Sequence, residues 1–523
     1  MIKNIKKLFG HLVVWSFGLL VAGCVNSTTT PAVRIAGQPV ELVSDFYTEP
    51  NAVAAPMSSD KSVGVILPMS GENAGVGNSI KSAIEIAFVQ KNAGVSAKFY
   101  DIADMSEMLV AEHDFVLGPV FANNAAAVRD AKSARVPAIS FSSNAASLGR
   151  GMYSVALMPG QSVDAIVSFM PSDGRTSVMI FAPNNDSGFV MANAAVRAVS
   201  AAGLRAAGLY YYTPADMDSI KAAAQTATSY DARVAANTRA REVLSDAILK
   251  GRVAGAERNR AVAQLEKLNK ADTIGDVGFD AALFLGGPAD SKSIASFLRY
   301  FDAPTRRVKF YGTAQWDDAA MYSEMSFAGA AYSAMPATAA GFAGIYEQAA
   351  GVAPTRLASM GYDAAGIAID ALSRADASVW LENPSGWRGL DGVLRFNADG
   401  TATRALAVWI LDGSGVPKLA MPAVPDFVHS APAHTAADNT RPRAFDNQDP
   451  VLLRDLIRLP ANVLGRYDLR NPKTENREPK SGIDEVQILP ESDTETIPGD
   501  AGFTPVVHDA VEKKLVDEVT LRR

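Results

Sequence analysis

Short apolar runs along the chain alternate with segments whose apolar residues recur at helical spacing. The first run, residues 62–68, has the length of a buried strand and is bounded by turn residues. A glycine-rich turn follows it, and residues 80–88 then place their apolar side chains on one helical face. A strand, a turn and an amphipathic helix in this order predict one βα unit.

The same order repeats, which predicts several further strands. They are expected at residues 115–119, 137–141, 177–182, 281–286 and 308–312. Repeated βα units imply parallel sheets with right-handed crossovers, so the predicted fold class is α/β. Open sheets of this kind bind ligands at the carboxyl ends of their strands, and we expect any binding site in the turns that follow them.

The repeat is interrupted near residues 214–275, where one crossover helix is expected and a much longer segment stands. This segment is rich in Ala, Arg, Lys, Asp and Glu, and Gly251 and Gly255 mark a turn between two helical stretches. We interpret it as an inserted helical hairpin. Charged outer faces are typical of a hairpin that projects into solvent without a partner. The alternative is that the hairpin is a docking surface.

Composition changes at both ends of the body, which is predicted to span residues 61–425. Residues 24–60 are rich in Ser, Thr, Pro, Ala and Asn and predict a flexible tether. Residues 426–523 contain few aromatics and many Pro, Asp, Asn and Glu, so we predict a mostly disordered tail. Two stretches of the tail, 450–464 and 506–519, have helical patterns. They are either partner-binding segments that fold on contact or transient helices without a role.

Cys24 is the one cysteine of the chain, and it follows a basic and then apolar N-terminus. The interrupted apolar run at residues 8–20 is too short for a transmembrane span, which needs about 20 apolar residues, so residues 1–23 are predicted to be a signal peptide. They resemble a bacterial lipoprotein signal, which implies cleavage before Cys24 and acylation of its thiol, palmitate included. Val25 resembles the sorting pattern of the outer membrane, with the chain facing the periplasm. The alternative is a buried cysteine behind an ordinary secretory signal.

Composition excludes several other classes of function. A lipidated Cys24 leaves no thiol for a disulfide or a nucleophile. The net charge of -7 argues against a nucleic-acid partner. The five histidines are scattered, so neither a metal site nor a cofactor is expected. No G-x-S-x-G, S-x-x-K or H-E-x-x-H motif is present, and we predict that the protein is not an enzyme.

Several segments resemble, in order, the type 1 periplasmic binding proteins, the group that includes branched-chain amino-acid receptors. They are residues 65–71, 116–119, 136–140, 182–188, 279–284, 361–365 and a G-x-x-G-x-x-x-F hairpin at 389–396. The resemblance covers residues 62–412. It implies two Rossmann-like lobes joined by three crossings, which close over a central cleft by hinge motion.

Within this group the chain resembles the penicillin-binding protein activators, lipoproteins that assist peptidoglycan synthases. Residues 312–317, Gly-Thr-Ala-Gln-Trp-Asp, are similar to the G-T-S-Q-W segment of that branch. The resemblance implies a class A penicillin-binding protein as partner and a role in cell-wall synthesis. The chain departs from the best-known enterobacterial activator, which carries a helical repeat domain before this fold, because the tether leaves no room for one.

The candidate ligand cleft lacks the groups with which receptors pair an amino acid. A buried α-carboxylate and α-ammonium each need fixed partners. Receptors carry hydroxyls after the third strand, where this chain has Phe121 and Asn123, and an acidic group near the position of Gln315. The remaining candidate donors and carboxylates are Ser70, Gly71, Ser142, Ser143, Asn144 and Asp186, with Asp317 or Asp318 nearby. We expect a cleft that is vestigial or takes another ligand, such as a cell-wall fragment.

The leading interpretation is a non-catalytic envelope lipoprotein that activates a peptidoglycan synthase by contact. The alternative is a lipid-tethered receptor that delivers an amino acid or another small polar ligand to an ABC permease. A third possibility is a structural envelope protein whose binding function lies in its tail.

Overall fold

The computed structural model describes residues 61–91, 94–304, 306–428 and 436–469. The predicted signal peptide, Cys24, the tether and the end of the tail lie outside these residues. The chain divides into two compact units, Met1–Tyr230 with Asp276–Asp449 and Asp231–Gly275 with Pro450–Arg523. We call the described part of the first the two-lobed unit and that of the second the helical module.

The first lobe is built on a five-stranded parallel sheet with strand order β2-β1-β3-β4-β5. Its strands are β1 (Ser62–Leu67), β2 (Ser96–Asp101), β3 (Phe115–Leu117), β4 (Ala138–Ser140) and β5 (Met152–Ser154). Its helices are α2 (Ala74–Lys91), α3 (Met105–Val110), α4 (Ala122–Ala131), α12 (Ala340–Ala350), α13 (Arg356–Leu372) and α14 (Ala377–Leu381). The chain therefore leaves this lobe after β5 and returns to it for α12.

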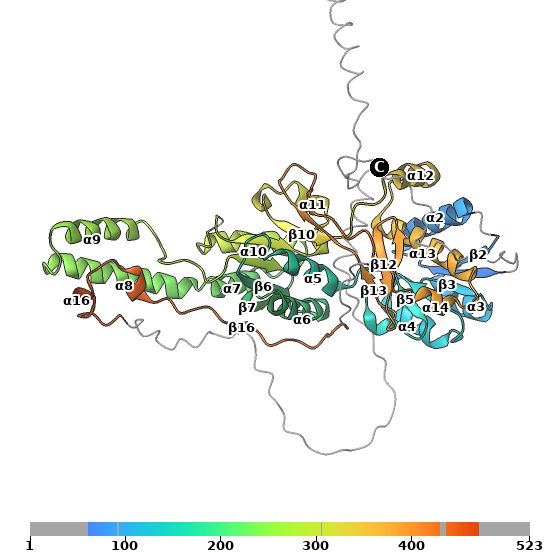
Figure 1. The fold of residues 1–523 in the computed structure, drawn as a ribbon, viewed down its shortest axis with the longest axis horizontal. Helices are drawn as coiled ribbons and strands as arrows, with labels where there is room; N and C mark the ends of the chain where they lie inside the picture. The colour runs from blue at the N-terminus through green and yellow to red at the C-terminus, as the bar shows by residue number, and fades with distance from the viewer. Residues whose placement is uncertain (1–60, 92–93, 305, 429–435, 470–523) are drawn as a thin grey trace, which may run out of the picture. The chain divides into compact units, whose positions relative to one another are not determined.

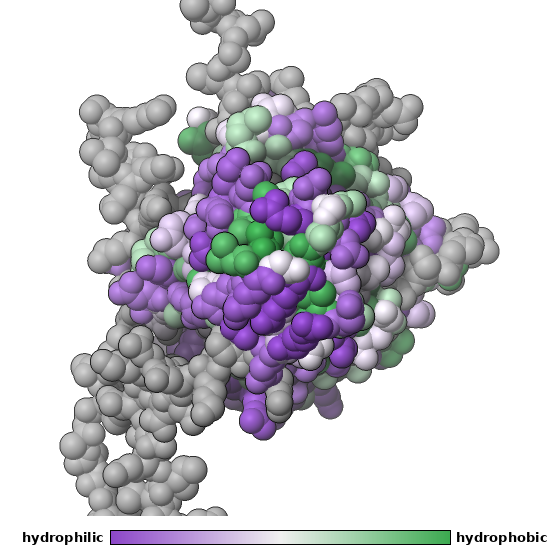
Figure 2. Space-filling view, turned by 90° about the vertical axis from the view of Figure 1, so that its left-hand side faces the viewer, coloured by the Kyte–Doolittle hydropathy of each residue, from purple (hydrophilic) through white to green (hydrophobic). Residues whose placement is uncertain are grey.

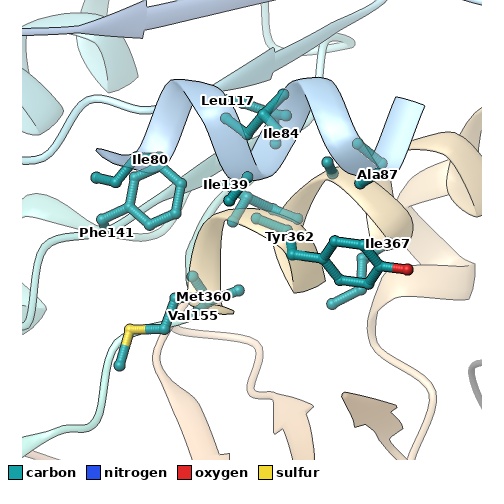
Figure 3. Packing of buried hydrophobic residues seen from close by; sticks show 14 of the residues in the cluster. Ile80, Ile84, Ala87, Leu117, Ile139, Phe141, Val155, Met360, Tyr362 and Ile367 are labelled. Atoms are coloured by element: carbon teal, nitrogen blue, oxygen red, sulfur yellow. The ribbon is translucent and has the colours of Figure 1, made fainter. Parts of the chain in front are cut away.

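Helices α2 and α13 pack side by side on the first sheet (Figure 1). Ile80 and Ile84 of α2 and Ile367 of α13 are fully buried, together with Leu117 and Ile139 from the strands below (Figure 3). The helices approach closely because α13 has a glycine at position 361, where a Cβ atom would lie 3.0 Å from Cγ2 of Ile80. Two helices that are far apart in the sequence thus share one core.

The second lobe contains an eight-stranded sheet with strand order β15-β14-β10-β9-β8-β6-β7-β16. Its strands are β6 (Ser177–Pro183), β7 (Arg205–Tyr212), β8 (Ala281–Phe284), β9 (Lys309–Gly312), β10 (Ala331–Ala334), β14 (Ala407–Ile410), β15 (Lys418–Met421) and β16 (Phe445–Asp446). Its helices are α5 (Pro159–Phe169), α6 (Asp186–Ala201), α7 (Met217–Ala227), α10 (Pro288–Tyr300) and the short α11 (Ala319–Tyr322). Strands β6 to β10 run parallel, while β14, β15 and β16 pair antiparallel with their neighbours.

Every residue of β6 is buried, because helices cover both faces of this sheet. Val178 and Ile180 face the core that contains α5 and α6. Met179 and Phe181 alternate with them and face the core that contains α7 and α10. Strands buried on both faces read as continuous apolar runs, which is why the sequence revealed this strand so clearly.

Three crossings join the lobes, after β5, after β10 and after β13. A small antiparallel sheet of β11 (Trp387–Gly389), β12 (Gly392–Phe396) and β13 (Ala402–Arg404) precedes the third. Arg404 Nε donates to the Val155 carbonyl at 2.9 Å, which ties the third crossing to the first. The structure thus confirms the α/β prediction of two lobes with parallel sheets.

The hairpin between β11 and β12 fits closely around a buried carboxylate, that of Asp363 on α13. Asp363 Oδ1 accepts from the Leu390 backbone N–H at 2.8 Å. A Cβ atom at Gly389 would lie 2.1 Å from Asp363 Oδ2, so glycine is needed there. Gly392 has a φ of 88° and abuts Pro336. The G-x-x-G pattern therefore has a packing role.

The buried carboxylate of Asp363 makes stability depend on pH. Burial, followed by the nearby charge of Asp391, raises the pKa of Asp363 to about 7. The folded chain therefore keeps a proton that the unfolded chain loses near pH 4, and this contribution to stability is lost as pH rises through about 7. We expect the free energy of unfolding to fall by on the order of 3 kcal/mol between pH 5 and pH 7.5 from this group. Urea unfolding at both pH values measures it.

The Asp363→Asn variant is the control for this pH effect, because its amide oxygen can still accept from Leu390. Its free energy of unfolding should fall less between pH 5 and pH 7.5 than that of the parent chain. If parent and variant show the same decrease, the titrating group is not Asp363.

The helical module consists of α8 (Tyr230–Leu249), from residue 231 on, and α9 (Gly255–Leu268), together with α15 (Leu453–Leu456) and α16 (Ala461–Leu464). Gly251 and Gly255 have φ values of 60° and 53°, which confirms the predicted turn. The insertion is shorter than the predicted range 214–275, because α7 buries Ile220 and Ala224 in the second lobe. Residues 214–230 thus supply the expected crossover helix.

Residues 436–469 have defined structure, although the sequence analysis assigned them to a mostly disordered tail. Strand β16 pairs with β7, and the Asn447 N–H donates to the Ala207 carbonyl at 2.8 Å. The Arg441 guanidinium lies 4.8 Å from the ring centroid of Tyr211. Further on, Leu453, Ile457 and other apolar side chains complete the core of the helical module. Hydrogen bonds and a few apolar side chains order this polar segment, and composition alone did not reveal them.

Candidate functional site

The loop after β1 carries two of the predicted cleft residues at the surface. Ser70 and Gly71 are exposed, and Gly71 adopts a left-handed φ of 72°. A Cβ atom at Gly77, in the first turn of α2, would lie 2.0 Å from the Pro68 carbonyl oxygen. Gly71 in the loop and Gly77 at the start of α2 therefore allow a tight turn between the strand and the helix.

The loop after β4 uses part of its polar groups internally. Ser142 is buried, and its hydroxyl accepts from the Asn144 N–H at 3.2 Å. Asn144 Oδ1 in turn accepts from the Ala146 N–H at 3.0 Å. Ser143 is exposed. The Ser142 hydroxyl thus shapes the loop, whereas Ser143 and Asn144 are exposed at the surface.

The other predicted residues lie at the starts of helices or beside a strand end. Phe121 is the N-cap residue of α4 without a side-chain cap, and Asn123 is exposed in the first turn. Asp186 is exposed at the start of α6, where Asn185 provides the cap. Gln315 Nε2 lies 3.5 Å from the Leu285 carbonyl oxygen. None of these positions supplies the hydroxyl or fixed carboxylate of an amino-acid receptor.

A cavity of about 1530 Å³ brings three of the predicted residues together, namely Ser143, Asn144 and Asp186. Ser70, Gly71, Phe121, Asn123, Ser142 and Gln315 do not line it. Its walls come from α5, α6, the third crossing and residues 436–439. Alanine is the commonest residue in them, and the charged groups are Asp164, Asp186, Arg197, Asp399, Arg404 and Asp438. Burial raises the pKa of Asp164, and Arg197 opposes this shift.

The Gly-Thr-Ala-Gln-Trp-Asp segment proves to be a structural turn. The Trp316 indole packs on Gly312, where a Cβ atom would lie 2.0 Å from the ring. Trp316 Nε1 donates to Ser291 Oγ at 3.0 Å, and its side chain is fully buried. This packing fixes the next residue, Asp317, at the edge of the second lobe.

Asp317 takes part in an interlobe latch, defined as Asp317, Arg356 and Asp391 with the hydroxyls of Thr338 and Ser359. Arg356, at the start of α13 in the first lobe, donates to Asp317 of the second lobe at 3.1 Å. Its other terminal nitrogen donates to Asp391 at 2.8 Å. One guanidinium therefore joins the two lobes and the hairpin after β11.

Hydroxyl and carbonyl groups complete the latch. Thr338 Oγ1 donates to Asp391 Oδ1 at 2.6 Å, and Ser359 Oγ donates to the other carboxylate oxygen. Arg356 also donates to the Pro336 carbonyl at 2.9 Å, in the second crossing. Although burial alone lowers the pKa of Arg356, the two carboxylates raise it above its usual value. The latch is a charged network at the junction of the two lobes, and its polar groups are paired with one another.

The sequence marks Asp317 only as a loop carboxylate, and no motif in it points to Arg356 or Asp391 as functional. Asp391 lies within the G-x-x-G hairpin, and this pattern indicates a tightly packed turn at that position. No sequence pattern indicates the role of Arg356, because its two carboxylate partners lie 35 and 39 residues away along the chain.

Within residues 61–469, apart from the undescribed gaps, no three His, Cys, Asp or Glu side chains are grouped to hold a metal ion. In the same part of the chain, no helix combines the length and apolar character that a membrane span requires.

Comparisons with known proteins define the fold. No protein-family model and no curated protein matches the chain. A putative branched-chain amino acid ABC transporter protein from Rhodospirillum rubrum is 16% identical with a TM-score of 0.51, over 69% of this chain and 99% of that chain. The leucine binding protein LivK from Thermotoga maritima is 16% identical with a TM-score of 0.46, over 70% and 98%. The C-domain of LpoA from Haemophilus influenzae, described as a regulator of PBP1A, is also 16% identical with a TM-score of 0.46, over 69% and 100%.

These solved structures include both groups that the sequence resembles. At such low identity the similarity establishes the architecture alone. The chain has the type 1 periplasmic-binding fold, with two α/β lobes, three crossings and a helical insertion.

Proposed function

We propose that this protein is a non-catalytic lipoprotein, anchored to the outer membrane through Cys24, that activates a class A penicillin-binding protein by direct contact in the periplasm. The interlobe latch carries the proposal. A receptor reports that its ligand is bound by changing from an open to a closed arrangement of its lobes. A ligand shifts this equilibrium only if its affinities for the open and closed states differ. Here Arg356 joins the lobes through groups of the chain itself. Lobes held in this way present a constant surface to a protein partner.

The chemistry of the cleft supports the same proposal. An amino acid needs fixed donors for its carboxylate and an acidic partner for its ammonium. The Ser142 hydroxyl is used within its own loop, and Asp317 is used by the latch. The partner class comes from the sequence resemblance of residues 312–317 to the activator branch.

The alternative is a tethered receptor for an amino acid or another small polar ligand of an ABC permease. The cavity of about 1530 Å³ favours this candidate, because it gathers Ser143, Asn144 and Asp186 in one place. Its walls are mostly apolar and its charges mostly acidic, which suits a ligand with an apolar body better than a free amino acid.

Affinity capture from solubilised envelopes tests the proposal, with the full chain as bait. We expect a class A penicillin-binding protein among the captured proteins, and higher synthase activity when the two are mixed. A thermal-shift assay with leucine provides the second measurement, since ligand at 100 times its Kd would stabilise a receptor by about 2.7 kcal/mol. Capture of a permease without a penicillin-binding protein, or a clear shift with leucine, would favour the receptor instead.

A further inference from the structure

An apolar surface lies at the turn between α8 and α9 in the helical module. We call it the tip patch and define it by Ile248, Leu249 and Leu464. Leu249 is 84% exposed, and the other two pack against the module core while remaining partly exposed. Tyr467, three residues after Leu464, donates to Asp246 at 2.9 Å and places α16 beside the end of α8. Figure 2 shows an apolar patch ringed by hydrophilic residues on the face toward the viewer.

The helical module is basic, although the chain as a whole has a net charge of -7. Residues 231–275 and 450–469 contain twelve Lys and Arg against eight Asp and Glu. Arg258 and Arg260 lie in the first two turns of α9, which begins just after the turn that follows Leu249, and Arg466 stands two residues after Leu464. None of the three forms an ion pair with another described residue. An apolar centre with unpaired cations around it fits an acidic amphipathic helix.

The chain itself contains such a sequence beyond the described residues. Residues 484–505 contain six Asp and Glu and no Lys or Arg, and residues 506–519 after them contain four Asp and Glu against two Lys. Within them, Val507, Ala510, Val511 and Leu515 recur at the spacing of one helical face. Apolar spacing and acidic charge therefore complement the tip patch and its surroundings.

The linkage between this segment and the tip patch is short. Leu469 is the last described residue of the module, and residues 470–505 connect it to the segment. A coil of that length spans roughly 30 to 36 Å on average. The α8 helix is about 30 Å long, so the whole module lies within reach. Tethering of this kind gives an effective concentration on the order of millimolar.

We propose that residues 506–519 dock as an amphipathic helix on the tip patch of their own chain. Val507, Val511 and Leu515 then cover Leu249, and the acidic side chains face the arginines around it. A protein partner that uses this surface has to displace the segment. The inference is independent of the proposed activator function, since it rests on the module and the tail alone.

A labelled peptide with the sequence of residues 504–521 tests this docking in fluorescence anisotropy. The full chain with Val511→Asp and Leu515→Asp has its own segment disabled, so its tip patch is free. We expect the peptide to bind this variant at least tenfold more tightly than the parent chain, whose patch is occupied. The affinity should fall as salt rises from 0.05 to 0.5 M, because ion pairs contribute.

A third substitution localises the site. Adding Leu249→Asp to the variant should weaken peptide binding at least tenfold, whereas adding Val89→Asp, at an 80% exposed valine on α2, should leave it unchanged. Circular dichroism confirms that each variant is folded. Equal binding to parent and variant, absence of binding, or binding that survives Leu249→Asp would overturn the proposal. A dimer of the parent chain in sedimentation that Leu515→Asp abolishes would also overturn it, since the segment would then dock on a second copy.

Discussion

A chain that ends after Asp449 should lose the protected structure of α8 and α9, whereas a chain that ends after Leu469 should keep it. Residues 450–469 supply Leu453, Ile457, Leu459 and Val463 to the core of the module, each less than a tenth exposed. Burial of each aliphatic side chain contributes about 1.5 to 3 kcal/mol. Together they approach the 5 to 15 kcal/mol that stabilises a typical domain.

Without these side chains, α8 and α9 lose much of the apolar packing that stabilises them. Isolated helices of their length are marginal in water, and most helical stability in proteins comes from packing. Hydrogen exchange measured by mass spectrometry over residues 236–268 tests the expectation. Amides of Ala240, Val243 and Leu244 should exchange at least a hundredfold faster in the shorter chain. The chain ending after Leu469 is the matched control, since it retains every described residue. Retained protection after truncation at Asp449 would show that α8 and α9 are stable alone.

The Asp391→Ala substitution should destabilise the two-lobed unit by about 3 to 5 kcal/mol, the cost typical of leaving one partner of a buried ion pair alone. Asp391 is inaccessible to solvent and accepts from Arg356, Thr338 and Ser359. Its removal leaves a largely buried guanidinium with only Asp317 as a charged partner. Chemical unfolding followed by tryptophan fluorescence measures the loss.

Two further variants test whether the stability loss is specific to this buried network and not a general effect of removing a charge. Glu107→Gln breaks the pair between Lys98 and Glu107, whose side chains are 57% and 66% exposed, and should cost less than about 1 kcal/mol. The double variant Arg356→Met, Asp391→Leu should recover most of the stability, because apolar replacement removes both buried charges. A loss for Asp391→Ala no larger than that for Glu107→Gln would mean that the latch does not stabilise the unit.

The fold was predictable because the central strands of its sheets are buried on both faces. Residues 177–182 and 281–286 read as continuous apolar runs, and they form β6 and β8 nearly at the predicted limits. The turn at Gly251 and Gly255 was predictable for a different reason, since it requires backbone conformations that glycine adopts readily. In both cases the structure depends on features of nearby residues, namely an apolar run for the strands and glycine backbone conformations for the turn.

The site was less predictable, because its geometry depends on distant residues. Ser142 seemed available to a ligand, and only the structure reveals the local hydrogen bonds that use its hydroxyl. Asp317 and Arg356 meet across the two lobes without any pattern in the sequence to pair them. The order of residues 436–449 also depends on long-range partners, such as the Tyr211 ring beneath Arg441.

The core of the helical module is assembled from two segments that are 174 residues apart, between Gly275 and Pro450. During synthesis, α8 and α9 therefore emerge well before the side chains that complete their core. The core of the module cannot be complete until residues 450–469 have emerged, which is after the whole described part of both lobes. A single proteolytic cut anywhere from residue 276 to residue 449 would leave the two halves of this core on separate chains, held together by packing and no longer by a continuous backbone.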